Sequence, residues 1–357
     1  MWYEKTLKPL LFKLDPETAH DMAYMLGKLA SSSPAACHFI GKFAHTLVPD
    51  DPFMCWGLSF PNRLGLAAGF DKHGYLPAVL QALGFGFVEV GSATALPSQG
   101  NPRPRMFRLP ADRALINRMG LNNEGARRIV DRLIQAPAVQ IPVGINIAKT
   151  HNPQILGAAA IEDYRVSFSQ AVRFADYINV NISCPNTEEG KTFEDPEALS
   201  RLLTVLMAQP RRRNNRTIPV LVKLSADLDA PQRRELVSLC EEAGIDGYVA
   251  VNTSGLRKSL VHSSDADIAR AGRGGLSGAP LLQRSLDTIS DLHSLTGGRK
   301  PIIGVGGIVE PSSAVEMRQA GASLVQVYSG LVYKGPGLVK QLRESLGTIR
   351  AESLPTH

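Results

Sequence analysis

The chain has 357 residues, of which 44% are hydrophobic and 20% are charged; this composition is that of a folded globular protein and excludes disordered, collagen-like and integral membrane classes. Its 39 lysines and arginines against 33 aspartates and glutamates leave a net charge of +6, an excess too small to identify an anionic partner by itself. The four cysteines, none in a C-x-x-C pair, are too few to stabilise so long a chain through disulfides and favour a reducing compartment.

Residues 1–45 are predicted to form a small helical segment, distinct from residues 46–357. Leucines recur at helical spacing between residues 7 and 14, and Asp15-Pro16-Glu17 is typical of the start of a second helix. A short third helix should follow Pro34. The second helix is expected to turn its apolar residues inward, namely Ala19, Met22, Ala23, Met25, Leu26 and Leu29. No run reaches the roughly 18 apolar residues of a membrane span, so we expect neither a span nor a signal peptide.

From residue 63 onward, short apolar runs alternate with helical patterns, which predicts a parallel sheet with crossover helices. The candidate strands are residues 64–70, 87–91, 143–148, 177–182, 220–224, 248–251, 302–305 and 324–328. The helical patterns that follow them cover residues 76–83, 124–135, 164–175, 197–208, 232–243, 281–295, 312–320 and 338–346. Eight β/α units without an early G-x-G-x-x-G turn favour an α/β fold of the (β/α)8 TIM barrel type over a doubly wound sheet.

Polar side chains follow six of the predicted strands, at the ends where barrel enzymes build their active sites. They are Asp71 and Lys72 after the first strand, Ser92 after the second, Asn146 in the third, Asn181 and Asn186 after the fourth, Lys223 in the fifth, and Asn252 and Thr253 after the sixth. Contact with solvent explains any one polar strand end. Six together predict a site at one mouth of the barrel.

Glycines follow the last two predicted strands, in the sequences Gly304-Val305-Gly306-Gly307 and Tyr328-Ser329-Gly330. Barrels commonly bind a phosphate there through backbone N–H groups and a helix N-terminus, although two tight turns would leave the same pattern. Residues 274–278, Gly-Gly-Leu-Ser-Gly, are interpreted as another glycine-rich loop that closes over a phosphorylated ligand.

Cys184 lies between Ser183 and Pro185 at a predicted strand end. Lys72 or Lys223 within reach would lower the pKa of its thiol from about 8.5 and make it a base or a nucleophile, whereas the other three cysteines are interpreted as inert core residues. The segment Asn117 to Asn123 offers several amides and one guanidinium, groups that suit a carboxylate or a planar amide ring.

These residues together resemble the dihydroorotate dehydrogenases, and the whole chain resembles their class 2, the membrane-associated, quinone-reducing form. The matching segments are residues 66–72, 116–123, 179–187, 274–278, 301–308 and 320–330, with the N-terminal helices ahead of them. The resemblance implies oxidation of (S)-dihydroorotate to orotate in pyrimidine synthesis. A hydride passes to FMN, and the electrons then pass to a second acceptor.

The resemblance also assigns residues to the two ligands. The positions implied for FMN are Ala68, Gly69, Phe70, Asp71, Lys72, Ser92, Asn146, Asn181, Lys223, Val251, Gly278, Gly307, Tyr328 and Ser329. The positions implied for dihydroorotate are Lys72, Asn117, Arg118, Met119, Gly120, Leu121, Asn181, Asn186, Asn252 and Thr253. A cation beside the flavin, expected to be Lys223, would stabilise its reduced anionic form.

Cys184 departs from the class 2 pattern, in which a serine usually removes the C5 proton; a cysteine is expected in the soluble class 1 enzymes. The helical N-terminal segment still favours a quinone, reached through an apolar mouth, and implies peripheral contact with the cytoplasmic face of the inner membrane. The alternatives are a class 1-type enzyme that uses fumarate or NAD, and another FMN barrel such as a tRNA dihydrouridine synthase. Neither a metal nor a nucleic-acid partner is expected, and a monomer is favoured.

Overall fold

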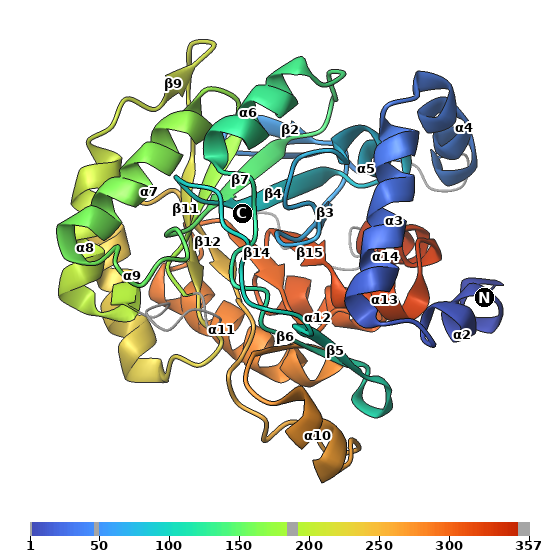
Figure 1. Ribbon diagram of the computed structural model, residues 1–357. Helices are drawn as coiled ribbons and strands as arrows, with labels where there is room; N and C mark the ends of the chain where they lie inside the picture. The colour runs from blue at the N-terminus through green and yellow to red at the C-terminus, as the bar shows by residue number, and fades with distance from the viewer. Residues whose placement is uncertain (1, 46–49, 184–191, 349–357) are drawn as a thin grey trace.

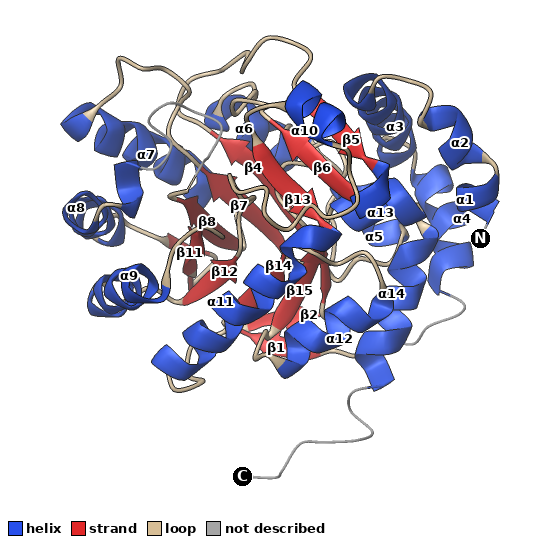
Figure 2. Ribbon diagram, turned by 90° about the horizontal axis from the view of Figure 1, so that it is seen from below, coloured by secondary structure: helices blue, strands red, loops and turns tan. Residues whose placement is uncertain are grey.

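The structure is a computed structural model that describes residues 2–45, 50–183 and 192–348. Its centre is a closed barrel of eight parallel strands (Figures 1 and 2). In barrel order these are β3 (Leu64–Leu66), β4 (Phe87–Ala93), β7 (Val143–Ile147), β8 (Tyr177–Asn181), β11 (Val220–Leu224), β12 (Gly247–Ala250), β14 (Ile302–Val305) and β15 (Leu324–Val327), which pairs with β3. The predicted (β/α)8 barrel is confirmed.

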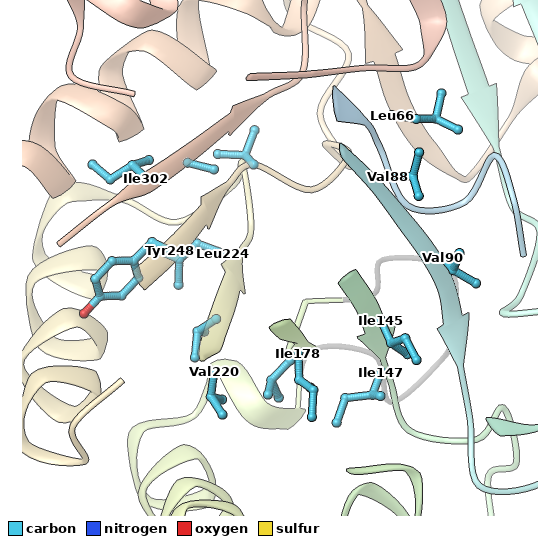
Figure 3. Packing of buried hydrophobic residues seen from close by; sticks show 14 of the residues in the cluster. Leu66, Val88, Val90, Ile145, Ile147, Ile178, Val220, Leu224, Tyr248 and Ile302 are labelled. Atoms are coloured by element: carbon cyan, nitrogen blue, oxygen red, sulfur yellow. The ribbon is translucent and has the colours of Figure 1, made fainter. Parts of the chain in front are cut away.

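The barrel strands are buried on both faces, and this explains why they consist of continuous apolar runs. Residues that point outward, such as Val88 and Ile145, pack under the surrounding helices (Figure 3). Those that point inward, such as Phe87 and Tyr177, form a second cluster inside the barrel. Gly65 and Gly144 leave room for these two rings, because a Cβ at either glycine would lie 2.3 or 2.1 Å from the nearest ring atom.

One helix follows each barrel strand and covers its outer face (Figure 2). These are α5 (Pro77–Ala82), α6 (Ala126–Gln135), α7 (Gly157–Val172), α8 (Pro196–Met207), α9 (Ala230–Glu242), α11 (Leu282–Leu295), α12 (Pro311–Gln319) and α14 (Gly337–Thr348). Local chemistry sets their starts: Asp229 forms a capping box with Gln232 at α9, and Asp195 accepts from the Ala198 N–H at α8.

A hairpin closes the amino-terminal end of the barrel. It consists of β1 (Phe53–Cys55) and β2 (Leu58–Phe60), and Phe60 packs edge-to-face on Phe87 inside the barrel. Trp56 donates from Nε1 to the backbone oxygen of Asp246 at 3.0 Å. The sequence did not reveal this hairpin, because three-residue strands have too few positions to display an alternating pattern.

A three-stranded antiparallel sheet lies at the opposite end, at the mouth. It consists of β5 (Met106–Leu109), β6 (Ala114–Asn117) and β13 (Gly275–Gly278) (Figure 1). The interpretation of residues 274–278 as a loop was wrong, because the main chain of this segment pairs with β6. The described residues also form two short helices, α10 (Asp265–Ala271) and α13 (Ser329–Lys334), and the hairpin of β9 (Arg212–Arg213) and β10 (Arg216–Thr217).

The N-terminal helices are α1 (Trp2–Lys5), α2 (Leu7–Leu11), α3 (Pro16–Ser31) and α4 (Pro34–His45), and α3 lies against the barrel beside α5 and α13 (Figure 1). The predicted start of α3 is confirmed, because Asp15 caps it by accepting from the Glu17 and Thr18 N–H groups. None of the described helices is long and apolar enough to cross a membrane.

The predicted inward face of α3 was wrong for four of its six residues, whereas Ala19 and Ala23 line a cavity between α3 and the barrel. Met22, Met25, Leu26 and Leu29 are 48–68% exposed. The face that meets the barrel is polar and aromatic instead: Glu17 pairs with Arg105, Tyr24 donates to Asp71 at 2.8 Å, and Ser31 accepts from the Val79 N–H. Specific hydrogen bonds therefore orient this helix, and its apolar face is left on the surface.

Candidate active site

A cavity opens at the carboxyl ends of the barrel strands, under the mouth sheet of β5, β6 and β13. Seven of the barrel strands or the loops that follow them contribute to its wall, which brings together residues from position 67 to position 329. The residues expected to bind ligands that line this cavity are Ala68, Gly69, Lys72, Ser92, Asn117, Met119, Gly120, Leu121, Asn181, Lys223, Val251, Asn252, Thr253, Gly278, Gly307, Tyr328 and Ser329.

The amides and hydroxyls at the strand ends form a continuous hydrogen-bonded chain. Asn252 donates from Nδ2 to Asn181 Oδ1 at 3.1 Å and to the Ser183 backbone oxygen at 2.5 Å. Asn181 Nδ2 lies 3.4 Å from Ser92 Oγ, and Ser92 donates to Asn146 Oδ1 at 2.5 Å. Because each group holds the next, the donors and acceptors of the cavity wall have fixed directions.

The glycine-rich end of the cavity includes Gly307, a position where a side chain would collide with the start of α11. Gly307 has φ of +102°, and a Cβ there would lie 2.4 Å from the Leu282 Cα. Ser329, the first residue of α13, donates to Ser277 Oγ at 2.9 Å. Hydroxyls and backbone N–H groups from β13 and from the loops after β14 and β15 thus gather at one place, as a phosphate group requires.

Two lysines supply the positive charge of the cavity. Lys223 is almost fully buried on β11. Lys72 lies on the loop after β3, where burial lowers the pKa of its ammonium group to about 8, with Glu17 on α3 opposing part of that shift. Both cations are positioned to attract an anionic substrate or an electron-rich ring.

Four expected ligand residues do not line this cavity. Asp71 accepts from the Gly74 and Leu76 N–H groups at 2.7 and 2.8 Å and so orders the loop after β3. Phe70 faces a second cavity, and Asn146 lies behind Ser92. Arg118 donates to the backbone oxygens of Ala271 and Arg273 and stacks over the Phe107 ring, so it fastens the mouth sheet to α10.

Cys184 and Asn186 lie outside the described residues, which stop at Ser183 and resume at Thr192. Ser183 itself is held by Asn252 and by a 3.2 Å hydrogen bond from its Oγ to the Lys223 backbone oxygen. The residue immediately before Cys184 is therefore anchored to the cavity wall through Asn252.

Several lining residues were not among the expected ligand positions. They are Ala67, Met106, Leu115, Asn122, Ser277, Leu281, Val305, Gly306, Ile308, Gln326 and Val327. Ser277 and Gly306 lie in glycine-rich segments that the sequence did single out. Met106 and Leu115 belong to the mouth strands β5 and β6, and Gln326 is a polar residue inside an otherwise apolar strand. That isolated glutamine was the one feature of the sequence that could have indicated its place in the cavity wall.

The second cavity is predominantly apolar and lies between α3, α5, the mouth strands and α13. Its lining includes Leu11, Ala19, Leu80, Phe85 and Val339. Arg108 donates to the backbone oxygens of Leu11 and Leu14 beside it.

A thin wall separates the two cavities, because Met106, Leu115 and Tyr328 line both. Tyr328 packs edge-to-face on Phe70 with ring centroids 5.3 Å apart, and the His20 ring lies 5.0 Å from Phe70. Burial and the nearby Lys72 charge lower the pKa of His20 to about 3, so this imidazole is neutral at physiological pH.

The barrel, the polar cavity at its mouth and the adjoining apolar cavity define a (β/α)8-barrel enzyme with two ligand sites side by side. The described residues contain no group of three or more His, Cys, Asp or Glu side chains arranged to hold a metal ion. The family model described as dihydroorotate dehydrogenase matches residues 53–349.

Similar proteins agree with this match. The dihydroorotate dehydrogenase (quinone) of Chloroflexus aurantiacus is 42% identical, over 98% of this chain and 97% of that protein. The protein of the same name from Chromobacterium violaceum is 42% identical, over 93% and 94%. The crystal structure of ligand-free DHODH from Eimeria tenella is 32% identical with a TM-score of 0.82, over 95% and 96%. The chain belongs to the dihydroorotate dehydrogenase family, in its quinone-dependent class 2.

Proposed function

We propose that this chain oxidises dihydroorotate to orotate in pyrimidine biosynthesis, with FMN in the polar cavity and a quinone as electron acceptor in the apolar one. The observation that carries the proposal is the thin wall of Met106, Leu115 and Tyr328 between the two cavities. A substrate and an acceptor of opposite polarity can then occupy separate sites on either side of one redox group.

The residues of the polar cavity fit FMN. Gly307, Ser277 and Ser329 line one end of that cavity, where backbone N–H groups and two hydroxyls suit a phosphate. At the floor, Gln326 Oε1 is a buried acceptor without a partner among the described residues, and an N–H of a flavin ring would satisfy it. When bound, FMN supplies a hydride acceptor that can pass its electrons on.

Dihydroorotate carries a carboxylate and two ring amides, and the other part of the cavity offers groups for each. Lys72 provides a cation for the carboxylate, while Asn117, Asn181 and Asn252 provide amide donors and acceptors for the ring. The hydrogen bond between Asn252 and Asn181 fixes both amides in advance, so less entropy is lost when the substrate binds.

Cys184 is proposed as the base that removes the C5 proton. Its neighbour Ser183 is tied to the cavity wall, which supports a position near the substrate. Lys223 is proposed to hold its ammonium group beside the flavin, where it would offset the negative charge that the ring gains on reduction.

The apolar cavity is proposed to bind the quinone ring. Arg108 and the neutral His20 supply polar groups at an otherwise hydrophobic site, which is the usual pattern of a pocket that orients a mostly apolar ligand. Because His20 does not titrate above pH 5, we expect quinone binding to be independent of its protonation.

The surface beside the apolar cavity supports peripheral contact with the cytoplasmic face of the inner membrane, through the segment of residues 1–45. Its exposed large apolar residues are Leu7, Leu10, Leu14, Met22, Met25, Leu26, Leu29 and Phe39. Helices that expose leucines among lysines can lie at a lipid interface without crossing it, and a quinone could then enter directly from the lipid.

Separate half-reactions test this function. The purified protein should show flavin absorption bands, lose them when dihydroorotate is added without oxygen, and regain them on addition of a short-chain quinone. Fumarate and NAD are the control acceptors. Reoxidation by either of these at the rate of the quinone would contradict a quinone-dependent function, and absence of bound flavin would contradict the use of FMN.

A further inference from the structure

The centre of the barrel holds a buried carboxylate that the proposed reaction does not use. Glu89 on β4 has no exposed surface, and four donors surround it. Asn146 Nδ2 and Asn179 Nδ2 donate to Oε1 at 3.0 and 2.7 Å. Gln326 Nε2 and the Tyr177 hydroxyl donate to Oε2 at 2.9 and 3.3 Å. Strands β4, β7, β8 and β15 therefore meet at this one side chain.

The hydrogen-bond pattern at Glu89 is the one expected around a charged carboxylate. A carboxylate only accepts hydrogen bonds, whereas a protonated carboxyl group must donate one. Three of the four contacts of Glu89 come from amide N–H groups, which can only donate, and the fourth is the Tyr177 hydroxyl; all four partners are neutral. The interior of the barrel thus carries a negative charge one side chain away from the polar cavity, because Gln326 touches both Glu89 and that cavity.

The Glu89 carboxylate also fixes the orientation of two side-chain amides, those of Asn146 and Gln326. Asn146 and Gln326 present their NH2 groups to Glu89, so their oxygens face the other way. Asn146 Oδ1 accepts from Ser92, and the chain of hydrogen bonds continues to Asn181 in the cavity wall. Gln326 Oε1 is left as a buried acceptor at the cavity floor without a partner among the described residues. With an amide in place of Glu89, one of these directions would have to reverse.

We propose that Glu89 is a positioning residue for the flavin: it fixes the amide directions of Asn146 and Gln326, and its charge lowers the reduction potential of the bound flavin. This inference rests on the proposed function. A reduced flavin gains negative charge, and a carboxylate in the low-dielectric barrel interior opposes that gain. Lys223 acts in the opposite direction, so the potential reflects the balance of the two charges.

The variant Glu89→Gln removes the charge and keeps the shape of the side chain. In the FMN-loaded protein, we expect its equilibrium between oxidised and reduced flavin to shift at least tenfold toward the reduced form. For a two-electron couple, this is a rise in midpoint potential of about 30 mV. The matched control is Asp163→Asn, a buried carboxylate on α7 that accepts from Thr150 outside the cavity; its potential should equal that of the unmodified protein.

A second variant is expected to shift the midpoint potential of the flavin in the opposite direction. Tyr177→Phe withdraws one donor from the Glu89 carboxylate, leaves its charge less compensated and should lower the potential. If Glu89→Gln does not fold, the Tyr177→Phe potential decides: a lower value supports the inference, and an unchanged value overturns it. A folded, flavin-bound Glu89→Gln protein with an unshifted potential also overturns it. If the unmodified protein binds no FMN, the proposed function itself fails, which is a distinguishable result.

Discussion

At the scale of single residues, Lys72 makes the charge of the polar cavity depend on pH. Its pKa of about 8 in the folded protein means that the ammonium group loses its proton above pH 8, well before a lysine in water does. Only the protonated form attracts the carboxylate of orotate or dihydroorotate. Affinity for these anions should therefore be constant below pH 8 and fall above it, approaching tenfold per pH unit.

Titration of orotate binding between pH 6 and 10 checks this expectation. The variant Lys72→Met should bind orotate weakly at all pH values and show a flat profile. If the unmodified protein and Lys72→Met lost affinity in parallel above pH 8, another group would be responsible for the pH dependence.

Cys184 allows a second test at this scale. Cys184→Ala should abolish flavin reduction by dihydroorotate and leave reoxidation by quinone intact, because only the first half-reaction removes a proton from carbon. Cys184→Ser should retain part of the activity, with its pH optimum displaced upward, since a hydroxyl is a much weaker acid than a thiol. Stopped-flow reduction from pH 6 to 10 measures both effects, and an alanine variant reduced at the normal rate would rule out Cys184 as the base.

At the scale of elements, the sequence predicted the barrel well and the N-terminal helices only in part. Runs such as β11 (Val220–Leu224) are buried on both faces, so composition alone marks them as strands. Periodicity in α3 revealed an apolar face, but it cannot state what that face contacts. The decisive contacts of α3 come from Glu17 and Tyr24, whose partners Arg105 and Asp71 are distant in sequence.

In the candidate site, too, some residues could be predicted from the sequence and others could not. Residues that end barrel strands, such as Asn181 and Lys223, could be placed from the sequence because topology brings strand ends together. Met106 and Leu115 could not, because β5 and β6 are four-residue strands that become part of the site through antiparallel pairing across the mouth. The carboxylate at Glu89 was hidden in a predicted core strand.

Glu17 connects α3 to the end of the polar cavity that is proposed to bind the substrate. It accepts a bidentate pair from Arg105, which also holds the backbone oxygens of Gln99 and Asn101. Asn101 in turn donates to the Met119 backbone oxygen in the cavity wall. Glu17→Gln leaves the Arg105 charge buried without a full partner, and we expect a loss of about 3–5 kcal/mol in the free energy of unfolding, together with a higher KM for dihydroorotate.

Urea unfolding and steady-state kinetics measure these two effects. Glu197→Gln on α8 is the matched control, because its pair with Arg201 is exposed and such pairs contribute about 0.2–1 kcal/mol. An equal, small loss in both variants would show that the Glu17–Arg105 pair does not anchor α3.

At the scale of the whole molecule, the exposed apolar face of α3 predicts where the protein meets a membrane. The triple substitution Met25→Ser, Leu26→Ser and Leu29→Ser should abolish sedimentation with phospholipid vesicles, because it removes the three most exposed large apolar side chains of this helix. Flavin reduction by dihydroorotate should be unchanged, since none of the three lines the polar cavity.

The matched control places the same change elsewhere on the surface. Leu96→Ser, Val261→Ser and Leu295→Ser remove three exposed apolar side chains that lie outside the N-terminal helices. This protein should sediment with vesicles as the unmodified one does. If both triple variants lost vesicle binding equally, general surface hydrophobicity and not α3 would account for it.

The wall of Met106, Leu115 and Tyr328 also affects how resistance to an inhibitor of the apolar cavity would arise. An organism that escapes such a compound by altering these three side chains also reshapes the polar cavity that is proposed to bind the cofactor. Escape through Ala19, Ala23 or Gly27 on the opposite side carries no such penalty, because these residues line the apolar cavity alone. Resistance should therefore arise less readily against a compound that binds mainly to Met106, Leu115 and Tyr328 than against one that binds mainly to α3.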